Sequence, residues 1–338
     1  MAELENTYTQ KDKEKLPSYF VKRVLNSPRL EESQCDKWIE KPVLLLVSND
    51  VHIYFKFLAL YNVHKVAYDE GLSDGEYAVV RIDSLVDNKY YMHADFEEKL
   101  FGGPDLSLVQ LAKEGVGTVC FQNAVFVPLG YASVPFRCKM EANTKNKCLA
   151  CAGPKEESHP MVTFAKRVRA TCGLERGSKE SNTTLVTLIS RKPYTRWKGD
   201  EAEKNFHRVL ENEDELVEAL QRAKKDLSFE LAVVHLETMD ICEQVEQAAS
   251  SDILMGVHGA GLVHLWWLVK RDATLIELEP SSQVANPSFR TLSALTGHKY
   301  IAVRAGQGKS KIGTEPVKVE PQKVIDEVTK IVDAKRHG

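Results

Sequence analysis

The stretch at residues 251–280, SDILMGVHGAGLVHLWWLVKRDATLIELEP, constrains the fold more than any other part of the chain. An apolar run stops at Gly256, a turn of small residues follows, and residues 262–269 have the composition of a buried helix. A second apolar run at 274–278 then closes on acidic residues. This order predicts a strand, a glycine turn, a helix and a second, parallel strand.

Such a turn predicts a nucleotide site at the carboxyl edge of a parallel sheet. Small residues after a strand let the backbone approach a ligand, and N–H groups that open a helix attract anions. An acidic residue at the end of the next strand suits a ribose hydroxyl. The candidate nucleotide-sugar ligands are His258, Gly259, Ala260, Gly261, Leu262 and Glu277. The alternatives are a plain strand–helix turn, a His258 that only caps it, and an ordinary strand-end carboxylate.

The HGAGL motif, with the IELEP strand after it, resembles glycosyltransferase family 61, and the similarity extends in order from about residue 35 to 303. It is greatest to the branch of EGF-domain-specific O-linked N-acetylglucosamine transferases. The other matching elements are Cys35-Asp36, Glu40-Lys41-Pro42, Asn49, His52, Phe57, Leu60, Tyr61, VCFQNAVF (119–126), Ser190-Arg191 and LVEAL (216–220).

The resemblance implies an inverting transfer of N-acetylglucosamine from UDP-N-acetylglucosamine to Ser or Thr of EGF-like domains. Two alternatives stay open: a catalytically degenerate relative that binds UDP-sugars, and a family 61 transferase with a different pentose donor, xylose or arabinose. Sites of this family lack an obvious DxD pair and so does this chain, so we expect no obligatory metal or other cofactor.

Arg191 is the first candidate for the diphosphate, because it directly follows the predicted strand at 184–189. Arginine offers a planar fork to phosphate oxygens and keeps its charge. A surface salt bridge is its plainer role. The family pattern has a second arginine cluster further along, for which Arg196 and Arg208 compete here. We favour Arg196, which we expect in a loop, over Arg208, which we expect in a helix at 203–210.

The catalytic base is less clear. In the resembled branch, an Asp follows the His of the first helix by four residues, but here Lys56 stands four residues after His52. A protonated lysine cannot accept a proton. Asp50 or His52 is the candidate replacement. If the position serves as the base, Lys56→Asp is expected to raise turnover; if nothing replaces it, the chain is the degenerate relative.

Strands alternate with helical patterns through most of the chain, which predicts an α/β fold of GT-B type: two Rossmann-like domains with a nucleotide-sugar cleft between them. The expected parts are a partly ordered segment at 1–40, an acceptor-side domain at 41–172, a linker at 173–182 and a nucleotide-sugar-binding domain at 183–338. The last helix is expected at 321–336.

Charge, hydropathy and cysteine content limit which partners, metal sites and disulfides the chain can have. The formal net charge of −3 on 338 residues gives no indication of a nucleic-acid partner, and no apolar run is long enough to span a bilayer. Seven cysteines include Cys148 and Cys151, half of a zinc site at best with Cys138, His159 or Cys172. Disulfides are the preferred reading for a lumenal chain.

The resemblance implies the lumen of the endoplasmic reticulum, with folded secreted or membrane proteins as acceptors. The polar beginning of the sequence does not read as a signal peptide, and DAKRHG is not an HDEL-type tail. Either the sequence is part of a longer chain or the protein has lost these targeting signals, and we expect the first, because the match begins partway into the family pattern. Asn182 begins an Asn-Thr-Thr sequon for N-glycosylation.

Overall fold

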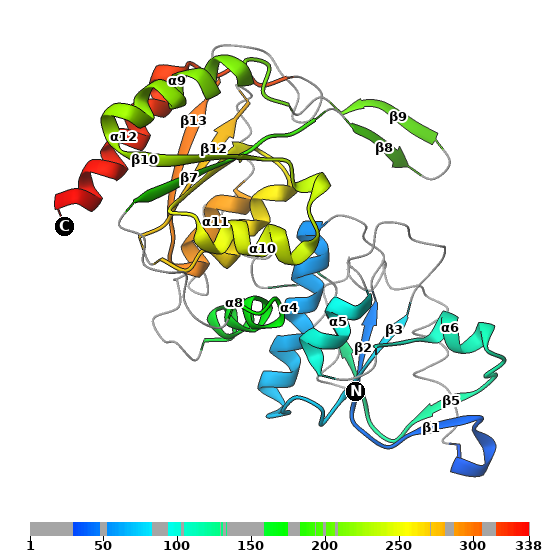
Figure 1. Ribbon diagram of the computed structural model, residues 1–338. Helices are drawn as coiled ribbons and strands as arrows, with labels where there is room; N and C mark the ends of the chain where they lie inside the picture. The colour runs from blue at the N-terminus through cyan, green and yellow to red at the C-terminus, as the bar shows by residue number, and fades with distance from the viewer. Residues whose placement is uncertain are drawn as a thin grey trace. The chain divides into compact units, whose positions relative to one another are not determined.

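Two parallel β-sheets carry the fold, one in each of the units into which the chain divides, Met1–Lys145 and Asn146–Gly338. The structure is a computed structural model (Figure 1). It describes residues 30–47, 53–82, 94–102, 105–128, 130, 133, 159–174, 183–192, 194–198, 201–206, 209–270, 272–280, 287–305 and 316–337. The predicted α/β class with parallel sheets is confirmed.

The sheet of the first unit has the strand order β4-β3-β2-β6, with every neighbouring pair parallel. Its strands are β2 (Val43–Val47), β3 (Ala78–Ile82), β4 (Asp105–Ser107) and β6 (Ala124–Val127). The sequence of β2 is VLLLV, and residues 43–46 are buried, as expected for a strand covered on both faces. Helix α4 (Ile53–Asp69) packs on β2 and β6, α5 (Ala94–Phe101) packs on β4, and α6 (Leu108–Lys113) packs on β3 and β4.

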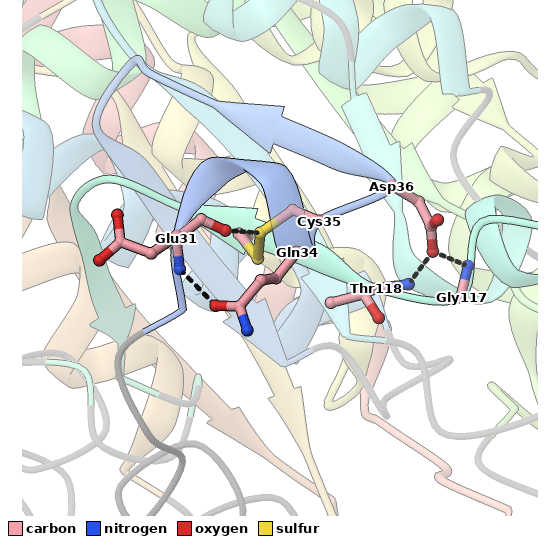
Figure 2. The surroundings of a disulfide bond; sticks show 7 residues. Glu31, Gln34, Cys35, Asp36, Gly117 and Thr118 are labelled. Carbon is pink, nitrogen blue, oxygen red and sulfur yellow. Dashed lines mark hydrogen bonds between the residues drawn. A yellow bond between two sulfur atoms is a disulfide. The ribbon is translucent and has the colours of Figure 1, made fainter.

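A disulfide and a carboxylate fasten the segment before β1 (Lys37–Ile39) to β5 (Val119–Phe121) and to the two residues before β5, as Figure 2 shows. Cys35 is bonded to Cys120, and β1 and β5 pair in parallel. One oxygen of Asp36 accepts hydrogen bonds from the backbone N–H groups of Gly117 and Thr118, at 3.0 and 2.7 Å. A Cβ on Gly117 would lie 3.1 Å from that oxygen, so the absence of a side chain there makes room for it.

The sheet of the second unit has the strand order β10-β7-β11-β12-β13, again parallel throughout. The strands are β7 (Thr184–Ile189), β10 (Phe229–Val234), β11 (Ile253–Val257), β12 (Thr274–Glu279) and β13 (Lys299–Arg304). After β7 the chain adds β10 on one side of it, then returns to add β11, β12 and β13 on the other. This is a doubly wound order, and the direction of winding reverses between β7 and β11.

Helices cover both faces of this sheet (Figure 1). On one face, α9 (Glu213–Leu227) and α12 (Pro321–His337) pack on each other and on the sheet. On the other lie α8 (Pro160–Thr171), α10 (Ile241–Ser250), the 3₁₀-helix η5 (Ala260–Trp267) and α11 (Ser288–Thr296). Alternate residues of each strand serve the α9–α12 core, for example Ile276 and Leu278 of β12, which leaves Glu277 and Glu279 for the opposite face.

The division of the chain falls earlier than the linker expected at 173–182. Helix α8, which the sequence placed in the first domain, packs on α10, α11 and η5 of the second unit. The indole N–H of Trp266 donates to the Met161 carbonyl oxygen at 3.2 Å, and a disulfide joins Cys172 to Cys242. Apolar burial against η5 outweighs proximity in sequence, so α8 belongs with the C-terminal sheet.

Two local expectations are corrected. Residues 203–206, the first part of the helix expected at 203–210, lie instead in β9 (Glu201–Phe206), which pairs antiparallel with β8 (Tyr194–Lys198). The sequence Gly-Asp at 199–200 is of a type that favours a hairpin between two strands, a signal that the helical interpretation passed over. The predicted helix after the HGAG turn is a 3₁₀-helix, in which the Leu262 N–H bonds to the Gly259 carbonyl three residues back.

Candidate functional site

The candidate site lies where the winding of the second sheet reverses. In doubly wound folds, ligands bind outside the carboxyl ends of the strands at that reversal, because the loops leaving the two central strands separate there. Here the two strands are β7, which ends at Ile189, and β11, which ends at Val257. Arg191 and the turn that begins at His258 follow directly. The strand order thus brings together two sequence-predicted elements almost 70 residues apart.

Arg191 lies against the backbone of Gly259. A Cβ built on Gly259 would overlap Nη1 of Arg191 and lie 3.1 Å from its Cζ. The φ of Gly259 is 172°, an extended value open to any residue, so close approach is the constraint at this position. The absence of a side chain therefore lets the guanidinium, a permanent positive charge, lie against the backbone of the turn that precedes η5.

The end of β7 is fixed by two further hydrogen bonds. The Ser190 N–H donates to the Val234 carbonyl oxygen at 2.9 Å, and the Ser190 hydroxyl donates to Glu213 at the start of α9 at 2.6 Å. Ser190 is buried, with 1% of its surface exposed. These contacts hold the residue before Arg191 and so orient the beginning of the loop that carries the guanidinium.

The next three residues, Ala260, Gly261 and Leu262, differ in their exposure to solvent. Ala260 and Gly261 are partly exposed at the start of η5, whereas the Leu262 side chain is buried among core residues. A Cβ on Gly261 would meet Cδ1 of Leu236 at 3.0 Å. Leu262, expected among the nucleotide-sugar ligands, therefore packs in the interior, and its N–H is used by the turn.

Beneath the turn, a buried polar network runs from β11 across β12 to β13. Nδ1 of His258 contacts Oε1 of Glu277, and Oε2 of Glu277 accepts from the Tyr300 hydroxyl at 2.7 Å. The same hydroxyl lies 3.0 Å from Glu279, whose other oxygen accepts from Nε of Arg304 at 3.2 Å. Burial, followed by the charge of Glu277, raises the pKa of Tyr300. The tyrosine therefore keeps its proton and remains a donor.

Glu277 does not face solvent in this structure. The residue is 0% exposed, and both of its carboxylate oxygens have protein partners. The role expected for it from the sequence, a ligand of the ribose hydroxyls, requires an accessible oxygen. The structure brings Glu277 to His258 instead.

Lys56 is an interior residue of the first unit. Its side chain is 5% exposed, and its Nζ forms an ion pair with Oε1 of Glu97 from α5 at 2.5 Å; Glu97 is 2% exposed. The two neighbouring candidates for the base, Asp50 and His52, lie outside the described residues. The ammonium group of Lys56 thus has a structural partner within its own unit.

The other sequence-predicted residues either lie outside the described residues or have places other than those expected. Arg196, expected in a loop, lies in β8 opposite Glu203, while Arg208 and Asn182 lie outside the described residues, as do Cys138, Cys148 and Cys151. Cys172 is in a disulfide, and the His159 side chain accepts the N–H of Met161 as the cap of α8. Two of the suggested zinc ligands therefore have other roles. Within the described residues, no group of three His, Cys, Asp or Glu side chains is arranged to hold a metal ion.

Sequence reasoning missed Tyr300 and Arg304. A signal was present: Glu277 and Glu279 interrupt an otherwise apolar strand at alternate positions, and buried carboxylates need partners. Tyr300 and Arg304 alternate with Ala302 on the next strand. The parallel register of β12 and β13, which places the carboxylates beside Tyr300 and Arg304 on the same face of the sheet, could not be predicted from the sequence.

The fold and the site define a doubly wound α/β protein with an arginine and a glycine turn at the reversal of winding. A model of the family Glycosyltransferase 61 matches residues 89–276, more than half of the chain. The chain belongs to glycosyltransferase family 61, as its motifs predicted.

Two kinds of transferase are among the curated relatives that are similar to it. A beta-1,2-xylosyltransferase of Oryza sativa subsp. japonica is 25% identical over 84% of this chain and 54% of its own length. The EGF domain-specific O-linked N-acetylglucosamine transferase of Mus musculus is 25% identical over 88% of this chain and 50% of its own. A beta-1,2-xylosyltransferase of Arabidopsis thaliana is 21% identical over 88% and 56%. The chain thus spans about half the length of the curated relatives it matches.

Proposed function

We propose that this chain is an inverting glycosyltransferase that moves N-acetylglucosamine from UDP-N-acetylglucosamine to a Ser or Thr hydroxyl of a folded EGF-like domain. The observation that carries the proposal is the placement of Arg191 on the backbone of Gly259 at the reversal of winding. Family membership supports a sugar transfer, and the mouse relative supports this donor and acceptor.

Departure of UDP requires stabilisation of the negative charge that develops on the diphosphate. A preorganised guanidinium and backbone N–H groups supply it without reorganisation at the moment of reaction. In our proposal, Arg191 binds the diphosphate oxygens, His258 donates a hydrogen bond to them, and the turn from Gly259 to Gly261 admits the phosphates to the backbone. No metal or other cofactor is part of the proposal. Attack from the opposite side of the sugar by the acceptor oxygen, after loss of its proton to a base, completes inversion.

In a GT-B arrangement the base comes from the acceptor-side domain. We place it at Asp50 or His52, which follow β2 in the sequence, where the strand order β4-β3-β2-β6 also reverses its winding. Lys56 is not part of the proposed catalytic group, because Glu97 pairs with it inside the first unit. Arg196 remains the proposed second arginine for the donor.

A pentose donor is the second candidate, favoured by the xylosyltransferases of rice and Arabidopsis among the relatives. Both donors present a UDP diphosphate to Arg191 and the turn, so the two candidates share one diphosphate site and differ only in the sugar pocket.

Two disulfides, Cys35–Cys120 and Cys172–Cys242, support maturation in an oxidising compartment. We propose the lumen of the endoplasmic reticulum, where folded secreted or membrane proteins with EGF-like domains are available as acceptors. None of the helices described in the structure is both long enough and apolar enough to cross a bilayer.

The test is to incubate the purified chain with UDP-N-acetylglucosamine, UDP-xylose or UDP-arabinose and a folded EGF-like domain, and to measure UDP release and acceptor mass. A gain of one N-acetylhexosamine supports the proposal, and a gain of one pentose selects the second candidate. No transfer from any donor, with UDP still bound, identifies a degenerate relative.

Arg191→Ala and Arg222→Ala form a matched pair for this assay. Arg222 is an exposed arginine of α9, with 72% of its side chain accessible, and α9 lies on the opposite face of the sheet from η5. We expect Arg191→Ala to weaken UDP binding at least tenfold and Arg222→Ala to leave it unchanged. Equal UDP affinity in the two variants overturns the assignment of Arg191.

A further inference from the structure

The carboxylate of Glu277 is enclosed between an imidazole and a phenol. Its Oε1 contacts Nδ1 of His258, its Oε2 accepts from Tyr300 at 2.7 Å, and the residue is 0% exposed. A buried carboxylate is tolerated only when its oxygens are satisfied. The sequence of β12 thus commits one interior position to a charged group, although an apolar residue there would pack without needing partners.

The carboxylate determines how His258 is protonated. An ionised carboxylate has only acceptor sites, so the ring nitrogen that contacts it must carry a proton. Nδ1 is therefore the N–H in the neutral ring, and a second proton can go only to Nε2. Among the described residues no protein group is hydrogen-bonded to Nε2, and 8% of the His258 side chain is accessible. The Phe289 ring packs edge-on at 5.3 Å between centroids and limits rotation of the imidazole.

Charged groups on two strands face this pair. Tyr300 on β13 touches both Glu277 and Glu279, and Arg304 on β13 balances Glu279. The Arg304 side chain is 72% exposed, whereas Glu277 and Glu279 are buried. An Nε2 that carries a proton is a hydrogen-bond donor, as binding of an anion requires, whereas an unprotonated Nε2 is an acceptor.

We propose that Glu277, held in place by Tyr300, is a positioning residue that fixes one proton of His258 on Nδ1, so that the second proton, taken up on Nε2 when the nucleotide sugar binds, makes Nε2–H a hydrogen-bond donor to a diphosphate oxygen. The inference rests on the proposed function, in which the turn binds that diphosphate. It assigns Glu277 to the orientation of His258 and not to the ribose, and it adds Tyr300 to the site.

The test reads the His258 ring directly by NMR. The full chain is labelled with ¹⁵N in its histidine rings, and the His258 signals are assigned by their loss in His258→Asn. Wild-type protein without ligand is expected to show the proton on Nδ1, and added UDP is expected to shift Nε2 more than Nδ1. Both measurements are made on wild-type protein, and only the assignment of the signals needs a folded His258→Asn variant.

Glu277→Gln and Glu279→Gln are the matched variants. An amide presents either an oxygen or an NH₂ group to Nδ1, so Glu277→Gln is expected to give a mixture of the two ring tautomers and about a tenfold weaker UDP affinity. Glu279→Gln makes the same chemical change two residues along β12, where the carboxylate touches Tyr300 but not His258. It is expected to leave the His258 tautomer unchanged.

A wild-type His258 with its proton on Nε2 overturns the proposal. So does a Glu277→Gln protein that keeps the single Nδ1–H tautomer and binds UDP within twofold of wild type. A merely structural role for Glu277 would lower the melting temperature without changing the tautomer. UDP that leaves every ring signal unmoved, and does not bind by calorimetry, instead overturns the proposed donor and with it the role of Nε2. Because the tautomer is read without UDP, the two failures are distinguishable.

Discussion

The guanidinium of Arg191 occupies the space in which a side chain on Gly259 would begin. Arg191 follows β7 and Gly259 follows β11, and the two residues meet because these strands are neighbours in the sheet. The glycine of the motif is therefore explained by its neighbour: its backbone is extended, and alanine would adopt that conformation without strain. We expect the pair to behave as one unit in binding UDP.

Gly259→Ala is predicted to displace Arg191 and weaken UDP binding about tenfold, roughly the contribution of one charge-assisted hydrogen bond. The substitution should have little further effect in an Arg191→Ala background, where the space is already vacant. A double-mutant cycle with UDP affinities from calorimetry measures the coupling. Additive losses in the double variant would show that Gly259 acts independently of Arg191.

Much of the second unit could be predicted from the sequence because its signals are local. Residues 251–280 carry a strand, a turn and a second strand in one continuous pattern, and all three were found. Arg191 was proposed as a site residue because it follows an apolar strand, and the strand order brings it to the glycine turn. The placement of α8 was missed, because it depends on burial against η5 and on a disulfide to Cys242, which lies 70 residues away in sequence.

The partners of the candidate side chains could not be predicted, because they depend on strand register and helix packing. Glu277 meets Tyr300 only because β12 and β13 are parallel neighbours in a particular register. Lys56 meets Glu97 only because α4 and α5 pack within one unit. In both cases the sequence pattern singled out a residue and predicted a role as ligand or catalyst, which requires an exposed side chain, whereas the residue is buried.

Lys56→Asp is now predicted to destabilise the first unit and not to raise turnover, contrary to the expectation drawn from the family pattern. The new carboxylate would face Glu97 in the interior, and disrupting a buried ion pair costs about 3–5 kcal/mol. Urea unfolding measures the loss, and UDP release measures turnover.

The charge-reversed double variant Lys56→Asp/Glu97→Lys is the control. It restores opposite charges at the same two positions and should recover most of the stability. A single Lys56→Asp protein that is as stable as wild type and turns over faster would return this position to the catalytic group.

Loss of the disulfide between Cys172 and Cys242 is predicted to destabilise the second unit. The bond closes a loop across a sequence separation of 70 residues and joins the end of α8 to α10. Restricting the unfolded chain in this way is typically worth about 2–4 kcal/mol. The variant Cys172→Ser/Cys242→Ser should unfold at a lower denaturant concentration than wild type. Dithiothreitol should lower the midpoint of wild type more than that of the variant, because the variant already lacks this disulfide. Equal midpoints for oxidised wild type and the variant would show that α8 is held by packing alone.

Asp252 is predicted to make the free energy of unfolding depend on pH in the acidic range. Burial raises its pKa, but the Leu185 N–H, Lys270 and Lys335 outweigh burial, so the pKa lies below its usual range. The two lysine nitrogens lie 2.7 and 2.6 Å from one carboxylate oxygen.

Because the folded-state pKa of Asp252 is depressed, the stabilisation is fully present above the unfolded value of about 3.9 and is lost as pH falls through the folded pKa. Asp252→Asn should cost about 2–3 kcal/mol at pH 7. The free energies of unfolding of variant and wild type should begin to approach each other below about pH 4, where Asp252 of the unfolded chain is protonated, and should converge only below the depressed folded pKa, where both proteins carry a neutral side chain at this position. Asp226→Asn, at an exposed position of α9, is the matched control and should change little at either pH. A difference between Asp252→Asn and wild type that stays constant from pH 7 to pH 3 would mean that packing, and not the charge of Asp252, provides the stabilisation.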